Sequence, residues 1–304
     1  MTVHPERFIT DGGMETCLIF HQGVDLPHFA SFPLLDREDG RSALLDYFRP
    51  YVDSARELGV GIVLDTPTWR ANPDWGEKLG YSPDALLRID GLGVELLQEL
   101  RREIGDSPPL VISGCVGPRG DGYQVGEEMT AEEARRYHSA QVHAFAEAGA
   151  DVVSGLTLTY ADEAIGIAHA AVDAEVPSVL SFTVETDGRL PSGQPLGEAI
   201  EQVDAATHGV ASHFMVNCAH PSHFLHVLDP DASWLERIHG VRANASRMSH
   251  AELDEADVLD EGDPEELALC YRELQERLPN LTVVGGCCGT DHRHVRAFAG
   301  IWSA

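Results

Sequence analysis

The chain has 304 residues, 50 of them acidic and 21 basic, and a formal net charge of −29 at pH 7. This charge leaves no basic surface to meet phosphate, so we expect no nucleic-acid partner. No apolar run approaches the length of a membrane span and the first residues lack a signal-peptide pattern, so we expect no membrane partner and a cytoplasmic location. The composition is compatible with a homo-oligomer.

Eight apolar, β-branched segments of strand character recur along the chain. Segments with helical periodicity lie between them, and the one from Thr130 starts with an N-cap threonine and ends near Gly149. Further helical segments cover 82–103 and 263–278. The eight strand segments are 7–13, 60–66, 109–117, 150–158, 176–184, 212–220, 238–246 and 281–289.

The regular alternation of strands and helices, without a composition break or a flexible linker, predicts one parallel α/β domain over residues 1–304. Eight such units at this length fit a (β/α)8 TIM barrel, with the surplus residues in loops around 18–40, 66–82 and 245–262. A doubly wound open sheet is the alternative, but the GxGxxG motif expected after its first strand is missing.

The six cysteines, in a chain without a secretory pattern, indicate reduced thiols that bind metal or react. Because a barrel brings the C-terminal ends of its strands to one mouth, Cys218 after the sixth strand should meet Cys287 and Cys288 after the eighth. Three thiolates with an open fourth position describe a zinc site that can bind a substrate. Glycines at 285–286 and Gly289 would allow the irregular turn that adjacent ligands require. Small buried apolar residues are the alternative, because no CxxC spacing is present.

Several motifs resemble the homocysteine S-methyltransferase family, and the resemblance runs from about residue 8 to 300. It implies a (β/α)8 barrel, one zinc ion per chain held by Cys218, Cys287 and Cys288, and methylation of a thiol amino acid on sulfur. The motifs are DGGMET at 11–16, GPRGDGY at 117–123, SFTVETDGRLPSGQPLGEAI at 181–200, VNC at 216–218 and GGCCGT at 285–290.

The resemblance also implies roles for residues near the strand ends. Asp11, followed by Gly12, would hold the amino acid part of the substrate and serve catalysis; a turn or cap role is the alternative. Asn217 would orient the loop beside the ligand cysteine by hydrogen bonding. Asn244 resembles an asparagine that completes the zinc shell when substrate is absent, with a helix N-cap as the alternative. Trp69 stands where some members have a tyrosine able to approach zinc, and it would face the donor or simply pack.

One departure from the family pattern concerns the substrate. Relatives have a glutamate near the end of the fourth strand that binds the amino group of homocysteine, and Leu156 occupies that position here. Thr157 beside it offers a hydroxyl but no charge. A second family glutamate is replaced by Cys17. We therefore expect weak binding of homocysteine, unless another acid such as Glu15 or Asp162 substitutes.

The combined pattern predicts a zinc-dependent S-methyltransferase whose partners are a small thiol acceptor and a methyl donor. A thiol with a pKa of about 8.5 is mostly protonated at neutral pH, and zinc lowers that pKa so that a thiolate is available. The donor would be a cation, a sulfonium or a quaternary ammonium, and the sulfonium compounds S-methylmethionine and S-adenosylmethionine are favoured over other donors. The acceptor would be homocysteine or a related thiol, bound to zinc as the thiolate. A zinc-dependent hydrolase or lyase and a non-catalytic zinc- or thiol-binding protein are the alternatives.

Overall fold

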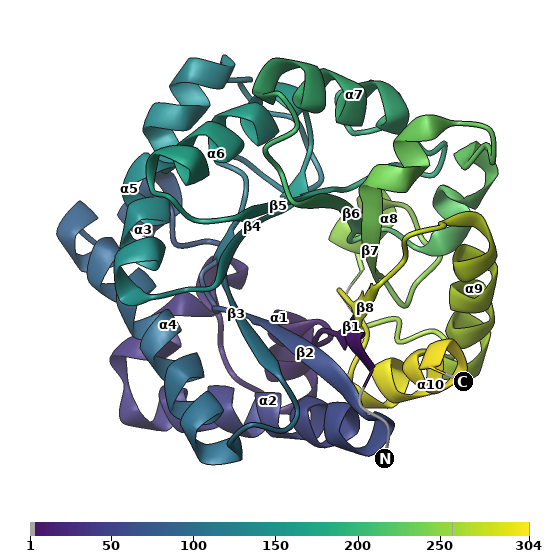
Figure 1. The fold of residues 1–304 in the computed structure, drawn as a ribbon. Helices are drawn as coiled ribbons and strands as arrows, with labels where there is room; N and C mark the ends of the chain where they lie inside the picture. Colours follow the sequence, from purple (N-terminus) through teal and green to yellow (C-terminus); the bar gives the residue numbers. More distant parts are fainter. Residues whose placement is uncertain (1–3, 257, 304) are drawn as a thin grey trace.

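Eight parallel strands form a closed barrel, and their order around the ring follows their order in the chain (Figure 1). The structure, a computed structural model, describes residues 4–256 and 258–303. The predicted (β/α)8 barrel is confirmed, and the open-sheet alternative is wrong. The strands are β1 (His4–Ile9), β2 (Val60–Asp65), β3 (Leu110–Val116), β4 (Val152–Leu158), β5 (Ser178–Phe182), β6 (His213–Asn217), β7 (Ile238–Ala243) and β8 (Val283–Gly286).

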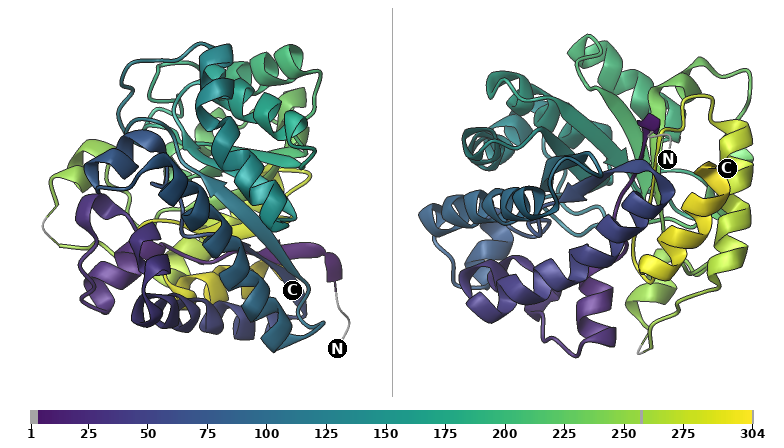
Figure 2. Two further views of the ribbon diagram at one scale, coloured as in Figure 1. Left: turned by 90° about the vertical axis from the view of Figure 1, so that its left-hand side faces the viewer. Right: turned by 60° about the horizontal axis from the view of Figure 1, so that its bottom comes forward.

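Helices lie outside the strands and cover the barrel, as the views from three sides show (Figures 1 and 2). The last helix packs beside the first long one and against β1 and β8, so the end of the described chain lies next to its beginning. The longer helices are α2 (Glu38–Leu58), α4 (Pro83–Ile104), α5 (Ala131–Ala148), α6 (Ala161–Asp173), α7 (Leu196–Thr207), α9 (Pro264–Arg277) and α10 (His292–Ser303). Only short 3-10 turns connect β6 to β7, namely η4 (Pro221–His223), η5 (Leu225–Val227) and η6 (Ser233–Arg237).

Local signals explain where these helices begin and end. The Glu133 N–H donates to Thr130 Oγ1 at 3.3 Å and the Thr130 N–H donates to Glu133 Oε2 at 2.9 Å, which forms a capping box at the start of α5. Gly149 ends α5 with a φ of 86°, in the left-handed region that glycine adopts readily. The predicted cap and stop are confirmed. At the starts of α4 and α9 the side chains of Ser82 and Asp263 accept backbone N–H bonds as simple N-caps, without a capping box.

The segments predicted as long loops contain short helical pieces that follow the C-terminal ends of strands. They therefore surround the mouth of the barrel. After β1 come α1 (Met14–Thr16), the π-helical turn η1 (Cys17–His21) and the 3-10 turns η2 (Pro27–Phe29) and η3 (Phe32–Asp36); α3 (Pro73–Lys78) follows β2, and α8 (His250–Asp254) follows β7. No helix in the described part of the chain is long and apolar enough to cross a membrane.

The buried apolar side chains fall into two groups. The large one joins the strands to the surrounding helices and includes the fully buried Trp302. The small one consists of Cys115, Leu156, Val179 and Met215, one side chain from each of β3 to β6. Leu156 is therefore part of an apolar group in which an unpaired charge would be costly.

Candidate metal centre and active site

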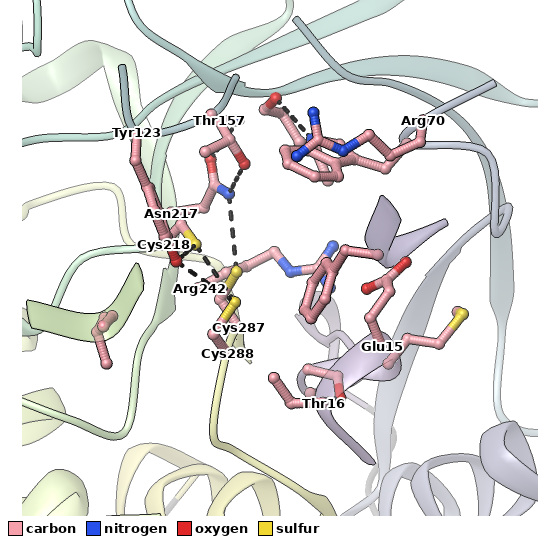
Figure 3. Close-up of a pocket in the computed structure, with 18 of the residues that line it drawn as sticks. Glu15, Thr16, Arg70, Tyr123, Thr157, Asn217, Cys218, Arg242, Cys287 and Cys288 are labelled. Atoms are coloured by element: carbon pink, nitrogen blue, oxygen red, sulfur yellow. Dashed lines mark hydrogen bonds between the residues drawn. The ribbon is translucent and has the colours of Figure 1, made fainter. Parts of the chain in front are cut away.

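A cavity of about 360 Å³ opens at the C-terminal ends of the strands, a size typical of small-molecule sites. Its walls come from the segments after β1, β2 and β3 and from the ends of β4, β6, β7 and β8 (Figure 3). Asn244 is not one of the residues that line it. The residues expected from the sequence that do line it are Asp11, Gly12, Trp69, Leu156, Thr157, Asn217, Cys218, Cys287 and Cys288.

Three cysteine sulfurs converge at this cavity (Figure 3). The Sγ atoms of Cys218, Cys287 and Cys288 all lie within 4.8 Å of one another, and the Cys218–Cys288 pair is 3.6 Å apart. Sulfurs bound at about 2.3 Å to a tetrahedral zinc ion lie about 3.8 Å apart, so the spacing suits such an ion. Within residues 4–256 and 258–303, this is the one group of three histidine, cysteine or acidic side chains placed to hold a metal.

The backbone around the cysteines is held in uncommon conformations. Cys218 has a φ of 57°, and its N–H donates to Arg242 O at 3.0 Å, which fixes the turn after β6 to the end of β7. Gly289 adopts a φ of 78°, as the irregular turn requires. Gly285 and Gly286 serve close packing instead, because a Cβ atom on either would lie within 2 Å of a threonine oxygen, 1.8 Å and 1.9 Å away respectively.

Asn217 links the metal-site turn to the end of β4. Its Oδ1 accepts hydrogen bonds from the Thr157 N–H at 2.8 Å and from Ser181 Oγ at 2.7 Å. Its Nδ2 donates to Thr157 Oγ1 at 2.8 Å and lies 3.9 Å from Cys287 Sγ. Thr157 has a φ of 61°, rare for a β-branched residue, and these bonds stabilise it there. The orienting role expected of Asn217 is consistent with these contacts.

Tyr123 is a site residue that the sequence analysis missed. Its Oη lies 3.2 Å from Cys218 Sγ and 3.6 Å from Cys288 Sγ. Its ring stacks on His250 with a centroid distance of 4.1 Å, and His250 Nε2 lies 2.9 Å from the Cys218 carbonyl oxygen. Glu185 Oε1 lies 3.1 Å from His250 Nδ1 and holds the other side of that ring. The signal available in the sequence was the tyrosine that ends the GPRGDGY motif.

Arg242, also missed, bridges two buried carboxylates at the mouth. Its Nη2 donates to Asp11 Oδ1 at 2.6 Å, and its Nη1 donates to Asp65 Oδ2. Tyr47 Oη donates to the other Asp11 oxygen at 3.1 Å. Burial raises the pKa of Asp11 to about 7, and the positive charge of Arg242 opposes that rise. Both oxygens of Asp11 therefore have protein partners, so it has limited capacity to bind a substrate ammonium group as well.

Three further residues predicted from the sequence make different contacts: Trp69, Gly12 and Asn244. Trp69 Nε1 donates to the Leu156 carbonyl oxygen at 3.2 Å, so two lining residues brace each other. Gly12 permits close approach, since a Cβ atom there would lie 2.6 Å from Thr290 O. Asn244 Nδ2 donates to Cys218 O at 3.0 Å, and its buried Oδ1 has no partner in the described part of the chain. Its role as a fourth ligand stays a prediction.

Of the two acids named as substitutes for the missing glutamate, one lines the cavity and the other does not. Glu15 lines the cavity. Asp162 accepts a hydrogen bond from Gln202 Nε2 at 3.1 Å, on the exposed side of α6, and does not line the cavity.

A closed parallel barrel with a cysteine cluster at its mouth defines a (β/α)8 enzyme with its site at the strand ends. The model of the homocysteine S-methyltransferase family matches residues 8–301. The chain therefore belongs to this family of methyltransferases.

Individual relatives agree with this membership. Homocysteine S-methyltransferase 4 of Zea mays is 27% identical over an alignment of 318 positions, gaps included, that covers 96% of this chain and 88% of that protein. Selenocysteine Se-methyltransferase of Brassica oleracea var. italica is 26% identical over 238 residues, 70% of this chain and 65% of that protein. The oxidized form of the homocysteine methyltransferase MmuM from Escherichia coli superposes with a TM-score of 0.78 at 20% identity, over 98% of this chain and 97% of that one. The metallated form of the same protein gives a TM-score of 0.73. The predicted family and fold are both confirmed.

Proposed function

We propose that this chain transfers a methyl group from a sulfonium donor, S-methylmethionine or S-adenosylmethionine, to the sulfur of homocysteine. We further propose that Cys218, Cys287 and Cys288 hold one zinc ion per chain for this reaction. Family membership supports the methyl transfer, and the convergence of three sulfurs at the cavity is the observation that carries the proposal.

The donor set suits zinc because thiolates are among its preferred ligands and three of them leave one position for a substrate. When bound, zinc lowers the pKa of an incoming thiol and so supplies a nucleophilic sulfur near neutral pH. Asn217 and the turn at Cys218 hold the ligand cysteines in place. Asn244, with its unpartnered Oδ1 and its bond to the Cys218 carbonyl, is the candidate for a fourth ligand before substrate binds.

The charges around the cavity favour a cationic donor. Among the described residues that line the cavity, Arg70 and Arg242 are the basic ones, and both are paired with carboxylates. During transfer the acceptor sulfur, already without its proton, forms a bond to the methyl carbon while the donor's S–CH₃ bond breaks. The donor leaves as a neutral thioether, so positive charge disappears in a site that fixed carboxylates surround. These acids are Asp11, Glu15, Asp65, Asp121, Asp254 and Asp260.

The cellular setting proposed from the sequence agrees with the state of the thiols. All six cysteines are free, and the three proposed metal ligands are within bonding reach of a shared ion. Such a site persists where thiols stay reduced, which supports the proposed cytoplasmic location.

The direct test is a transfer assay with the zinc-loaded protein, homocysteine deuterated in its carbon chain, and each donor unlabelled. Labelled methionine, detected by mass spectrometry, is the expected product. A product that incorporates water instead would favour the hydrolase or lyase alternative. Tight thiol binding without labelled methionine would favour the non-catalytic alternative.

A further inference from the structure

An amino-acid thiol brings an ammonium group into the cavity, and the described carboxylates differ in their freedom to bind it. A buried ammonium without a partner is costly, so one acid must face it. Asp11 and Asp65 share Arg242, which bonds to an oxygen of each. The second Asp11 oxygen accepts from Tyr47. These two acids therefore already share a cation of the protein itself.

A third acid is engaged in the same manner on the other side of the cavity. Asp121 Oδ2 accepts from Arg70 Nη2 at 3.3 Å, and Asp121 Oδ1 accepts from the Tyr123 N–H at 2.8 Å. Arg70 is itself fixed, since its guanidinium carbon lies 4.4 Å from the Trp69 ring centroid and 3.8 Å from that of Trp75.

Two acids lie at the exposed rim. Asp254 and Asp260 belong to the segment that follows β7, and both side chains are exposed to solvent. Asp260 accepts from Ser246 Oγ at 2.6 Å and from the Gly262 N–H at 3.0 Å, which fixes it in its own turn. Exposed carboxylates add to the general field but interact weakly with one bound charge.

Glu15 is the remaining acid, and its surroundings differ from those of the others. Its Oε1 accepts from Ser31 Oγ at 2.7 Å, a neutral donor that orients the carboxylate. Within residues 4–256 and 258–303, no arginine, lysine or histidine nitrogen lies within 4.0 Å of it. In Figure 3 Glu15 lies across the cavity from Tyr123 and Asn217, with the cysteine sulfurs between them. Burial raises the pKa of Glu15, while the hydrogen bond from Ser31 and the more distant positive charge of Arg242 oppose that rise.

We propose that Glu15 binds the ammonium group of the acceptor and thereby selects α-amino thiols over thiols without an amine. This inference rests on the proposed function, because it takes a thiol amino acid as the acceptor. Leu156, an apolar side chain on the same cavity, then serves as a wall against the carbon chain of the acceptor. The weak homocysteine binding expected from Leu156 alone is thus offset by Glu15, which arrives from a different strand end.

The experiment compares two thiols that differ only in the amine. Calorimetric titration of the zinc-loaded protein with homocysteine and with 4-mercaptobutanoate measures binding without any methyl donor. Glu15→Gln keeps the shape of the side chain and removes its charge. We expect it to weaken homocysteine binding about ten- to a hundredfold, the loss of one charge-assisted hydrogen bond, and to leave 4-mercaptobutanoate unchanged. Asp162→Asn, a carboxylate outside the cavity, is the matched control and should change neither affinity.

A second variant tests whether a carboxylate in the cavity is what binds the ammonium group. Leu156→Glu in the Glu15→Gln background returns a carboxylate to the cavity and should recover part of the lost homocysteine affinity. An equal loss for both thiols in Glu15→Gln would overturn the proposal, because it would show a structural role. Unchanged homocysteine affinity, or no homocysteine binding by the unmodified protein, would overturn it too. If the amine-dependent loss occurs but no donor yields labelled methionine, the proposed function fails while the assignment of Glu15 stands.

Discussion

The hydroxyl oxygen of Tyr123 lies 3.2 Å from the sulfur of Cys218, although the two residues come from different loops at the barrel mouth. The tyrosine ring is fixed in this position by stacking on His250, which itself contacts the Cys218 carbonyl group. A hydroxyl at this distance can donate to a cysteine thiolate and disperse part of its charge.

Tyr123→Phe should therefore weaken zinc binding by about ten- to a hundredfold, as is usual when a hydrogen bond to a metal ligand is lost. Competition with a chromophoric chelator measures the affinity. Tyr81→Phe, in which the hydroxyl lies away from the cavity, is the matched control. Equal affinities in the two variants would show that the Tyr123 hydroxyl does not act on the ligand sulfurs.

The three ligand cysteines should each be needed for metal. Changing Cys218, Cys287 or Cys288 to alanine should reduce the zinc content from about one ion per chain to a small fraction, because three-ligand sites lose affinity steeply when a ligand is removed. Elemental analysis of the purified protein gives the stoichiometry. Cys270→Ala on α9 should retain full zinc. Full zinc in both Cys218→Ala and Cys287→Ala would rule out the assigned site.

Arg242 should be essential for stability as well as for the site. Arg242→Met leaves Asp11 and Asp65 buried without their cation, and breaking a buried ion pair costs about 3–5 kcal/mol. Urea unfolding measures the change in free energy. Adding Asp65→Asn to Arg242→Met should recover part of the loss, because it removes one of the two stranded charges. If the double variant is no more stable than the single one, the carboxylates are not the cause.

His213 should contribute to acid sensitivity. It lies on β6 with its ring stacked on His239 at 5.1 Å, and burial lowers the pKa of His213 to about 4 from its ordinary value of 6.5. The folded protein then binds fewer protons than the unfolded chain between these two values. Its stabilising contribution is complete above pH 6.5 and is lost as the pH falls toward 4.

His213→Gln removes this titration. Between pH 7.5 and 5 the unmodified protein should lose up to about 2 kcal/mol more unfolding free energy than the variant, since one pKa unit corresponds to about 1.4 kcal/mol. Urea unfolding at the two pH values provides the comparison. Identical losses would mean that His213 titrates normally in the folded state.

Features that depend on local pattern could be predicted before the fold was known. The eight strand segments, the capping box at Thr130 and the stop at Gly149 follow from residues within a few positions of one another. The meeting of Cys218 with the Cys287–Cys288 pair was also accessible, because closing eight parallel strands brings all their C-terminal ends to one mouth. Neither prediction required knowing which side chains contact one another in the folded protein.

Which side chains face one another at that mouth depends on the packing of the whole barrel. Asp65 and Arg242 are 177 positions apart and Tyr123 and Cys218 are 95 apart, and no local periodicity connects either pair. The loop conformations that place Glu15 beside the cavity depend on contacts such as the one from Ser31. Strand and helix periods specify which face of an element is buried, whereas the partner across a cavity depends on how all eight loops pack together. For that reason the cysteines could be predicted and Glu15 could be named as one of two candidate acids, whereas Arg242, Tyr123 and the choice of Glu15 over Asp162 became visible only in three dimensions.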